Sequence, residues 1–188
     1  MRKTLLVLIL AAFAARTGFL AAQEKLTPGN LPDFLARYDT NFVPLEAAFT
    51  ELVNENLPLR DEEGQPLGRR PIEDRRQALF DLQRTAQQLA ANPQDLVLVA
   101  TLAIRTETLS DDLFDLSQIS YDNDREQLAK RLSDLQITMD HNKDLLADYL
   151  LSLAARKQER LQQLEKANTE LQRKLQEYEK KTRPGELP

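Results

Sequence analysis

The sequence contains a stretch of 59 residues, 124–182, without a single proline or glycine. Leu, Ala, Gln, Glu, Lys and Arg dominate the chain, and these residues form helices most readily. The stretch therefore predicts one long helix, or two helices nearly in line, reaching about 90 Å at 1.5 Å per residue. The two helices expected before it would reach only about 30–40 Å each. Its first half can pack against the rest of the chain, and its second half must extend beyond it.

The rest of the pattern predicts an all-α protein, with an antiparallel helical bundle over residues 33–153 and a long C-terminal coiled-coil helix. No segment of strand length alternates apolar and polar residues, and apolar residues instead recur three and four positions apart. The predicted core positions are Phe34, Leu35, Tyr38, Phe42, Leu45, Phe49, Leu52, Val53, Leu79, Leu82, Ala86, Leu89, Leu128, Leu132, Leu135, Met139, Leu146, Tyr149 and Leu153.

Two features divide the first part of the bundle. Pro44 is expected to break the first helix, because its ring clashes with the carbonyl four residues earlier. Residues 57–70 carry two prolines and two glycines among charged side chains. This composition predicts an exposed, flexible connector. A binding loop is the alternative, since loops of this length are often functional.

Two further turns are expected. At 92–95 we predict Asn92 as a helix cap, Pro93 at the first helical position and Asp95 near the positive end of the helix dipole. The following run LVLVATLAI is apolar nearly all round, so its helix should be the most buried, and its apolar positions continue through Leu109, Leu113, Phe114 and Leu116 to about Ser120. A turn at 121–123 is then expected, with Asn123 and Glu126 capping the next helix.

The first 22 residues predict an export signal. Two basic residues precede an eleven-residue apolar run, 5–15, which Arg16 ends. A membrane-spanning helix needs about 20 apolar residues, so a signal peptide fits better than an anchor. We expect cleavage after Ala22, a flexible lead-in at 23–32, and a periplasmic or secreted protein without stable membrane insertion. Cleavage after Ala14 and an uncleaved anchor are the alternatives.

Little in the sequence points to chemistry. The chain has no cysteine, which excludes disulfides, thiolate metal sites and thiol nucleophiles. His141 is the only histidine, and a zinc site with one histidine and no cysteine is uncommon. No Ser/His/Asp order and no glycine-rich phosphate loop occurs. We therefore expect no enzyme and no cofactor, and assign no catalytic or metal-binding residue.

The alternative is a periplasmic metal- or ligand-binding bundle that uses the acidic face at 107–126 together with 140–144. Asp122, Asn123 and Asp124 are similar to the start of an EF-hand loop. Gln127 and Ser133 stand where that loop needs glycine and glutamate, so calcium would bind weakly. Asp111 and Asp115 share a helix face and could act as paired acids, but solvated carboxylates are the simpler interpretation.

The clearest functional pattern lies in the predicted coiled-coil tail, 154–182, which precedes a C-terminus at 183–188 expected to be disordered. Read in heptads, the seam of this helix consists of Leu161, Leu164, Asn168, Leu171, Leu175 and Tyr178, with Thr182 at the next a position. The segment resembles leucine-zipper coiled coils over about three heptads, in its leucines at d and its single asparagine at a. This resemblance implies self-association.

The flanking charges agree with pairing between two chains. In a parallel dimer the facing g and e positions are Arg160 with Glu165, Ala167 with Gln172, and Lys174 with Glu179. Two of these three pairs are opposite in charge and none is repulsive. Between Leu153 and Leu161 the spacing becomes four plus four, which breaks the heptad phase and indicates a joint between bundle and tail.

Charge separates the two parts of the chain. Residues 23–155 have a net charge of −11, and residues 156–183 have +4. An exported chain that is acidic overall is a poor partner for nucleic acid. We expect an exported, non-enzymatic structural or adaptor module that forms a homodimer, or pairs with another coiled-coil protein, through its C-terminal helix. The alternative for the tail is a helix that folds back on its own bundle.

Overall fold

The computed structural model describes residues 25–54, 60–66 and 68–182. Every regular element in these ranges is a helix, and an isolated bridge joins Arg60 to Pro66. The helices are α2 (Leu31–Thr40), α3 (Phe42–Asn54), α4 (Arg69–Ala91), α5 (Leu96–Asp122) and α6 (Glu126–Thr182). The all-α prediction is confirmed. The predicted signal peptide and the predicted disordered C-terminus lie outside the described residues.

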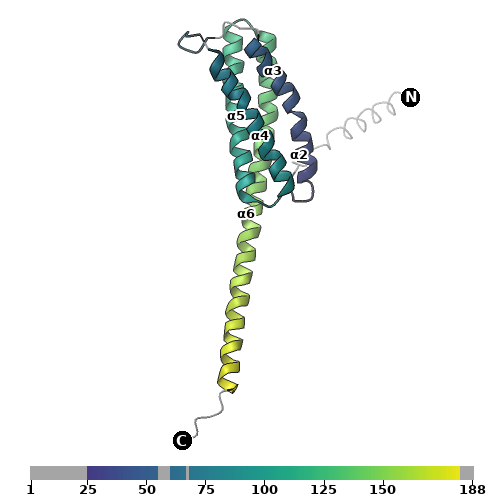
Figure 1. Cartoon of the computed structure of the whole chain (residues 1–188), viewed down its shortest axis with the longest axis vertical. Coiled ribbons are helices and arrows are strands. Elements are labelled where there is room, and N and C mark those ends of the chain that lie inside the picture. The colour runs from purple at the N-terminus through teal and green to yellow at the C-terminus, as the bar shows by residue number, and fades with distance from the viewer. Residues whose placement is uncertain (1–24, 55–59, 67, 183–188) are drawn as a thin grey trace, which may run out of the picture.

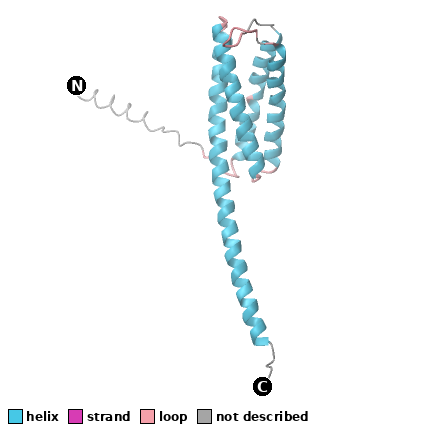
Figure 2. Ribbon diagram, turned by 90° about the vertical axis from the view of Figure 1, so that its left-hand side faces the viewer, coloured by secondary structure: helices cyan, strands magenta, loops and turns pink. Residues whose placement is uncertain are grey.

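The helices form a bundle (Figure 1). Helices α2 and α3 follow one another and occupy one position in this bundle, and α4, α5 and the first half of α6 each occupy another. Helix α5 packs most extensively on α6. Helix α6 runs along one edge of the bundle and continues far beyond it as a single rod (Figure 2). The prediction of one helix too long for its own domain is confirmed.

The predicted core of α2, α3, α4 and α6 is confirmed at eighteen of its nineteen positions, whereas Phe114 of α5 is 53% exposed. All nineteen predicted positions are buried except Leu135, which is partly buried and packs against the core. Six further residues that are polar are also buried, and most of them belong to α5. The three-and-four spacing locates the inward face of a helix directly, because neighbouring turns place such residues above one another.

Helices α2 and α3 are separated at Asn41, as the prediction of a break caused by Pro44 requires. Helix α2 ends at Thr40, whose carbonyl lies four residues before the proline ring. The amide of Asn41 donates to the carbonyl of Tyr38 at 3.1 Å, and Leu45 donates to Asn41 at 3.3 Å. The two helices therefore meet with their backbone groups paired across the break.

The turn between α4 and α5 corrects the predicted cap. Asn92 ends α4, since its amide donates to the carbonyls of Gln88 and Leu89 at 3.1 Å. The cap of α5 is Asp95, whose Oδ1 accepts from Val97 at 2.8 Å and Leu98 at 3.1 Å. Pro93 lies in the turn, so it is not the first helical residue. An aspartate cap combines hydrogen bonding with a charge at the positive end of the helix dipole.

The turn between α5 and α6 also differs from the prediction. Helix α5 continues to Asp122, and the Nδ2 of Asn123 donates back to the carbonyl of Ile119 at 2.7 Å. Asn123 thus closes α5, and it does not cap α6. Asp124 has a φ of 59°, the left-handed conformation that ends helices and that aspartate tolerates better than most residues.

Two segments predicted as flexible contain internal contacts. In the lead-in, Leu26 is buried in the core, and the amide of Thr27 donates to Oδ1 of Asn30 at 2.6 Å. In the connector, the amide of Asp61 donates to the carbonyl of Gln65 at 2.9 Å, which closes a short turn over residues 60–66.

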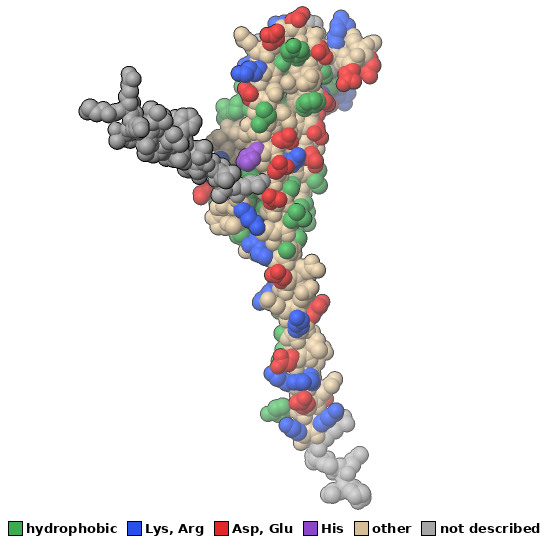
Figure 3. All heavy atoms as spheres, turned by 180° about the vertical axis from the view of Figure 1, so that it is seen from behind, with side chains coloured by type: hydrophobic (Ala, Val, Ile, Leu, Met, Phe, Trp, Pro, Cys, Tyr) green, Lys and Arg blue, Asp and Glu red, His purple; other side chains and the backbone are tan. Residues whose placement is uncertain are grey.

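The outer face of α5 and α6 corrects the expectation that the LVLVATLAI helix would be the most buried. Val97 is 73% exposed and Ile104 is 62% exposed. Figure 3 shows that hydrophobic side chains lie among aspartates and glutamates on this side of the molecule. The exposed hydrophobic residues of these two helices within the bundle are Val97, Ile104, Phe114, Tyr121, Ile137 and Leu151.

A buried chain of hydroxyl groups links α2 to α5. The Oγ1 of Thr106 donates to the carbonyl of Leu102 at 2.7 Å, so the hydroxyl of Tyr38, 2.7 Å away, donates to Thr106. Burial raises the pKa of Tyr38 far above the usual range, and the hydrogen bond to Thr106 acts weakly in the opposite direction. Burial also raises the pKa of Tyr149, whose hydroxyl donates to the carbonyl of Pro93 at 2.6 Å.

The raised pKa of Tyr38 predicts a loss of stability at high pH. The unfolded chain ionises this phenol near its ordinary value of about 10, whereas the folded chain keeps it protonated. The free energy of unfolding should therefore fall above pH ~10, by up to ~1.4 kcal/mol per pH unit for this group. Urea unfolding at pH 8, 10 and 11 should show a shallower decline for Tyr38→Phe than for the unchanged chain. Equal declines would contradict the assignment.

Candidate interaction surface on the projecting helix

The projecting half of α6 has no other part of the described chain around it. Leu153 is its last buried residue, and residues 154–181 are all exposed. The helix passes through 154–160 without interruption, although the heptad phase changes there. Most helical stability in proteins comes from packing an apolar face, and this part of α6 has no such packing within the described chain.

The predicted seam residues lie on this exposed part as a continuous stripe. Four leucines and one tyrosine of the seam are 51–72% exposed: Leu161, Leu164, Leu171, Leu175 and Tyr178. Asn168 is exposed among them. Nothing in the described chain folds back over the stripe, so the alternative of a tail packed on its own bundle receives no support.

The charged residues beside the stripe are paired along the helix. Nζ of Lys174 lies 2.9 Å from Oε1 of Glu170, and Nε of Arg173 lies 3.8 Å from Oε1 of Glu177. Both are pairs four residues apart on exposed positions, which contribute only about 0.3–0.5 kcal/mol. Lys174 can exchange such a partner for a residue of another chain at little cost.

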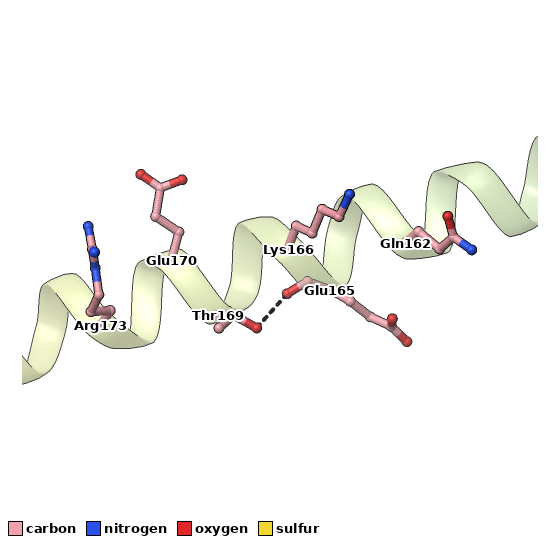
Figure 4. Close-up of a pocket in the computed structure, with 6 residues that line it drawn as sticks. All are labelled: Gln162, Glu165, Lys166, Thr169, Glu170 and Arg173. Atoms are coloured by element: carbon pink, nitrogen blue, oxygen red, sulfur yellow. Dashed lines mark hydrogen bonds between the residues drawn. The ribbon is translucent and has the colours of Figure 1, made fainter.

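The opposite side of the tail is polar. Figure 4 shows six side chains around a shallow hollow: Gln162, Glu165, Lys166, Thr169, Glu170 and Arg173. The hydroxyl of Thr169 donates to the backbone carbonyl of Glu165 at 2.9 Å. All six belong to one helix, so the hollow has no second wall and cannot enclose a ligand. The tail therefore presents one apolar side and one polar side.

The acidic residues of the alternative metal-binding site form no group of three possible ligands within the described residues. Asp140 accepts hydrogen bonds from Ser110 at 3.1 Å, Gln136 at 2.8 Å and Lys143 at 3.2 Å. The hydrogen bond from Lys143 to Asp140 raises the pKa of that lysine. His141 is exposed. Within the ranges that the structure describes, no group of three metal-ligating side chains occurs.

The backbone after Asp122–Asp124 does not form a calcium-binding loop. Helix α6 begins at Glu126, so a twelve-residue loop has no room between the helices. Asp111 and Asp115 remain exposed on α5, and Asp112 pairs with Arg75 of α4 at 2.6 Å. The predicted acidic site receives no support from the described residues.

One cluster of charged side chains, between α4 and α5, was not predicted from the sequence. A hollow of about 130 Å³ between α4 and α5 is bordered by Arg75, Arg105 and Asp112. Nη1 of Arg105 donates to the carbonyl of Asp81 at 2.9 Å and to Oγ1 of Thr85 at 2.6 Å. These arginines are engaged in holding α4 against α5. Arg105, directly after the apolar run LVLVATLAI, was the available signal.

Comparison with known proteins adds no relative. No protein family matches the chain, and no curated protein or solved structure is significantly similar to it. Within the described residues, none of the helices has both the length and the hydropathy that crossing a bilayer requires.

Proposed function

We propose that the protein is a non-enzymatic structural or adaptor module that self-associates through the projecting half of α6. The observation that carries this proposal is the apolar stripe on the tail, which is 51–72% exposed on a helix that extends beyond the rest of the described chain. Burying one such leucine stabilises an assembly by about 1.5–3 kcal/mol. The heptad spacing of the stripe, with its single Asn168, favours a second copy over other partners, and another coiled-coil protein is the alternative.

The self-association is tested by the molar mass of the chain from Gln23 to Pro188. Light scattering over a hundredfold range of concentration should give twice the chain mass at the upper end. Dilution should move the mass toward that of one chain. A mass of one chain at every concentration would contradict the proposal, and a dimer that forms only with a second protein would select the alternative.

We further propose export, which rests on the sequence of the first 22 residues. A basic start, a short apolar run and small residues before Gln23 support cleavage after Ala22. The intact mass of the protein from its producing cells should correspond to a chain that starts at Gln23. A chain that keeps residue 1 would contradict cleavage.

A further inference from the structure

The direction of the seam relative to the bundle decides how two tails can pair. Each residue of an α-helix advances about 100° around its axis. Counted from Leu153, which faces the bundle core, Leu171 returns to about the same direction, while Leu164 and Tyr178 lie within about 20° of it. Leu161 is the farthest, at about 80°. Because the core-facing Leu153 marks the bundle side of α6, the seam lies on that same side. Figure 2 shows that the other helices of the bundle stand to one side of α6.

This placement conflicts with a parallel dimer. In a parallel dimer the α6 helix of the partner would lie about 8–10 Å away on the seam side. Each of its residues would stand beside the equivalent residue of the first chain, along the whole length of α6. Before Leu153 in α6, the side that faces the core is already covered by the other helices of the bundle, mainly α5. The two bundles would occupy the same space. Only a sharp break of α6 within 154–160 could separate them, and α6 is continuous there.

We propose that the two tails pair antiparallel, so that the bundles stand at opposite ends of a shared rod. The inference rests on the proposed self-association through the tail. With a residues facing d residues, Leu161 lies opposite the partner's Tyr178, Leu164 opposite its Leu175 and Asn168 opposite its Leu171. Each of the six seam residues then faces a seam residue of the partner, and each pair occurs twice in the dimer. The partner's helix ends opposite Lys157, about 6 Å short of the level of Leu153, so it stops below the bundle without overlap.

The electrostatic terms are smaller than the steric one. The antiparallel pairing gives up the attraction of Arg160 to Glu165 and of Lys174 to Glu179, and it places Arg160 near the partner's Lys181. Exposed pairs of this kind contribute only about 0.2–1 kcal/mol each and are screened by salt. In return, the basic end of each tail approaches a partner bundle that is strongly acidic. The two Asn168 side chains lie about 4.5 Å apart along the axis, across the two-fold.

Disulfide crosslinking tests the direction of pairing, because the chain has no cysteine of its own. A disulfide needs Cα atoms about 4.4–6.8 Å apart. A tagged chain with Leu161→Cys is mixed with an untagged chain with Tyr178→Cys, and the mixture is oxidised. In the antiparallel dimer these positions face each other, whereas in a parallel dimer they are about 25 Å apart. We expect a covalent dimer of one tagged and one untagged chain.

The single variants are the controls. Oxidation of the Leu161→Cys chain alone should leave it uncrosslinked, and a covalent dimer from this chain alone would overturn the antiparallel arrangement. Failure of the mixture to crosslink, while light scattering under reducing conditions gives the mass of a dimer, would also overturn it. A mass of one chain for the unchanged protein would instead refute self-association itself, which the crosslinks do not measure.

Discussion

Replacing Leu164 and Leu171 together by lysine is expected to convert the dimer into a monomer. Both leucines belong to the exposed stripe, and each dimer would lose four of them. At about 1.5 kcal/mol or more for each buried leucine, the loss is ~6 kcal/mol. This raises the dissociation constant by about 10⁴-fold, since 1.4 kcal/mol corresponds to a factor of ten. The molar mass from light scattering should equal one chain at concentrations where the unchanged chain is dimeric.

The matched control places two lysines on the polar side of the same helix, as Gln162→Lys with Thr169→Lys. The spacing of seven residues and the number of added positive charges are the same as in the leucine variant. Both positions border the shallow hollow of Figure 4 and lie outside the seam. This control should remain dimeric. Dissociation of the control, or a dimeric leucine variant, would contradict the assigned interface.

Dissociation should also unfold part of α6. Residues 154–181 make no buried contact with the described chain, so a monomer lacks the packing that stabilises most protein helices there. The leucine variant should therefore lose circular dichroism signal at 222 nm. The thermal unfolding of its bundle should stay close to that of the control. A bundle that melts with the tail would show that the two parts are coupled.

The success of the core prediction and the failure of the cap prediction have different physical causes. Burial along α2, α3 and α4 follows from periodicity, which the sequence displays directly. The choice between Asn92 and Asp95 as the cap depends on backbone angles, because both residue types cap helices well. The run LVLVATLAI carries no periodicity at all. Its exposed members, Val97 and Ile104, are identified only when the neighbouring helices are in place.

The seam was predictable from the sequence, but its direction relative to the bundle was not. Heptad positions assign Leu161 to Tyr178 to one face of the tail without any knowledge of the bundle. The phase between Leu153 and Leu161 has meaning only if α6 is unbroken between them, because a kink would reset it. The absence of glycine and proline made continuity plausible, and the continuous α6 provides the missing step from a pairing pattern to a pairing direction.

The second large effect is expected from a pair of leucines five residues apart in α6. Leu146 is completely buried in the bundle, whereas Leu151 is 69% exposed. Leu146→Ala should lower the free energy of unfolding by about 2–5 kcal/mol, through lost burial and the cavity left behind. Leu151→Ala should change it by no more than about 0.5 kcal/mol. Both positions are helical, so the small difference in helix propensity between leucine and alanine affects both variants alike.

Urea unfolding of the two alanine variants is best measured on chains that also carry Leu164→Lys and Leu171→Lys, because dissociation of the dimer then contributes nothing. The midpoint should fall strongly for Leu146→Ala and remain nearly unchanged for Leu151→Ala, with similar dependence on urea concentration in both. Equal losses would mean that the outer face of α6 is covered by something the described chain does not contain. The three-and-four spacing of the sequence places Leu146, and not Leu151, on the core face, so this pair of variants tests the predicted face of α6 directly.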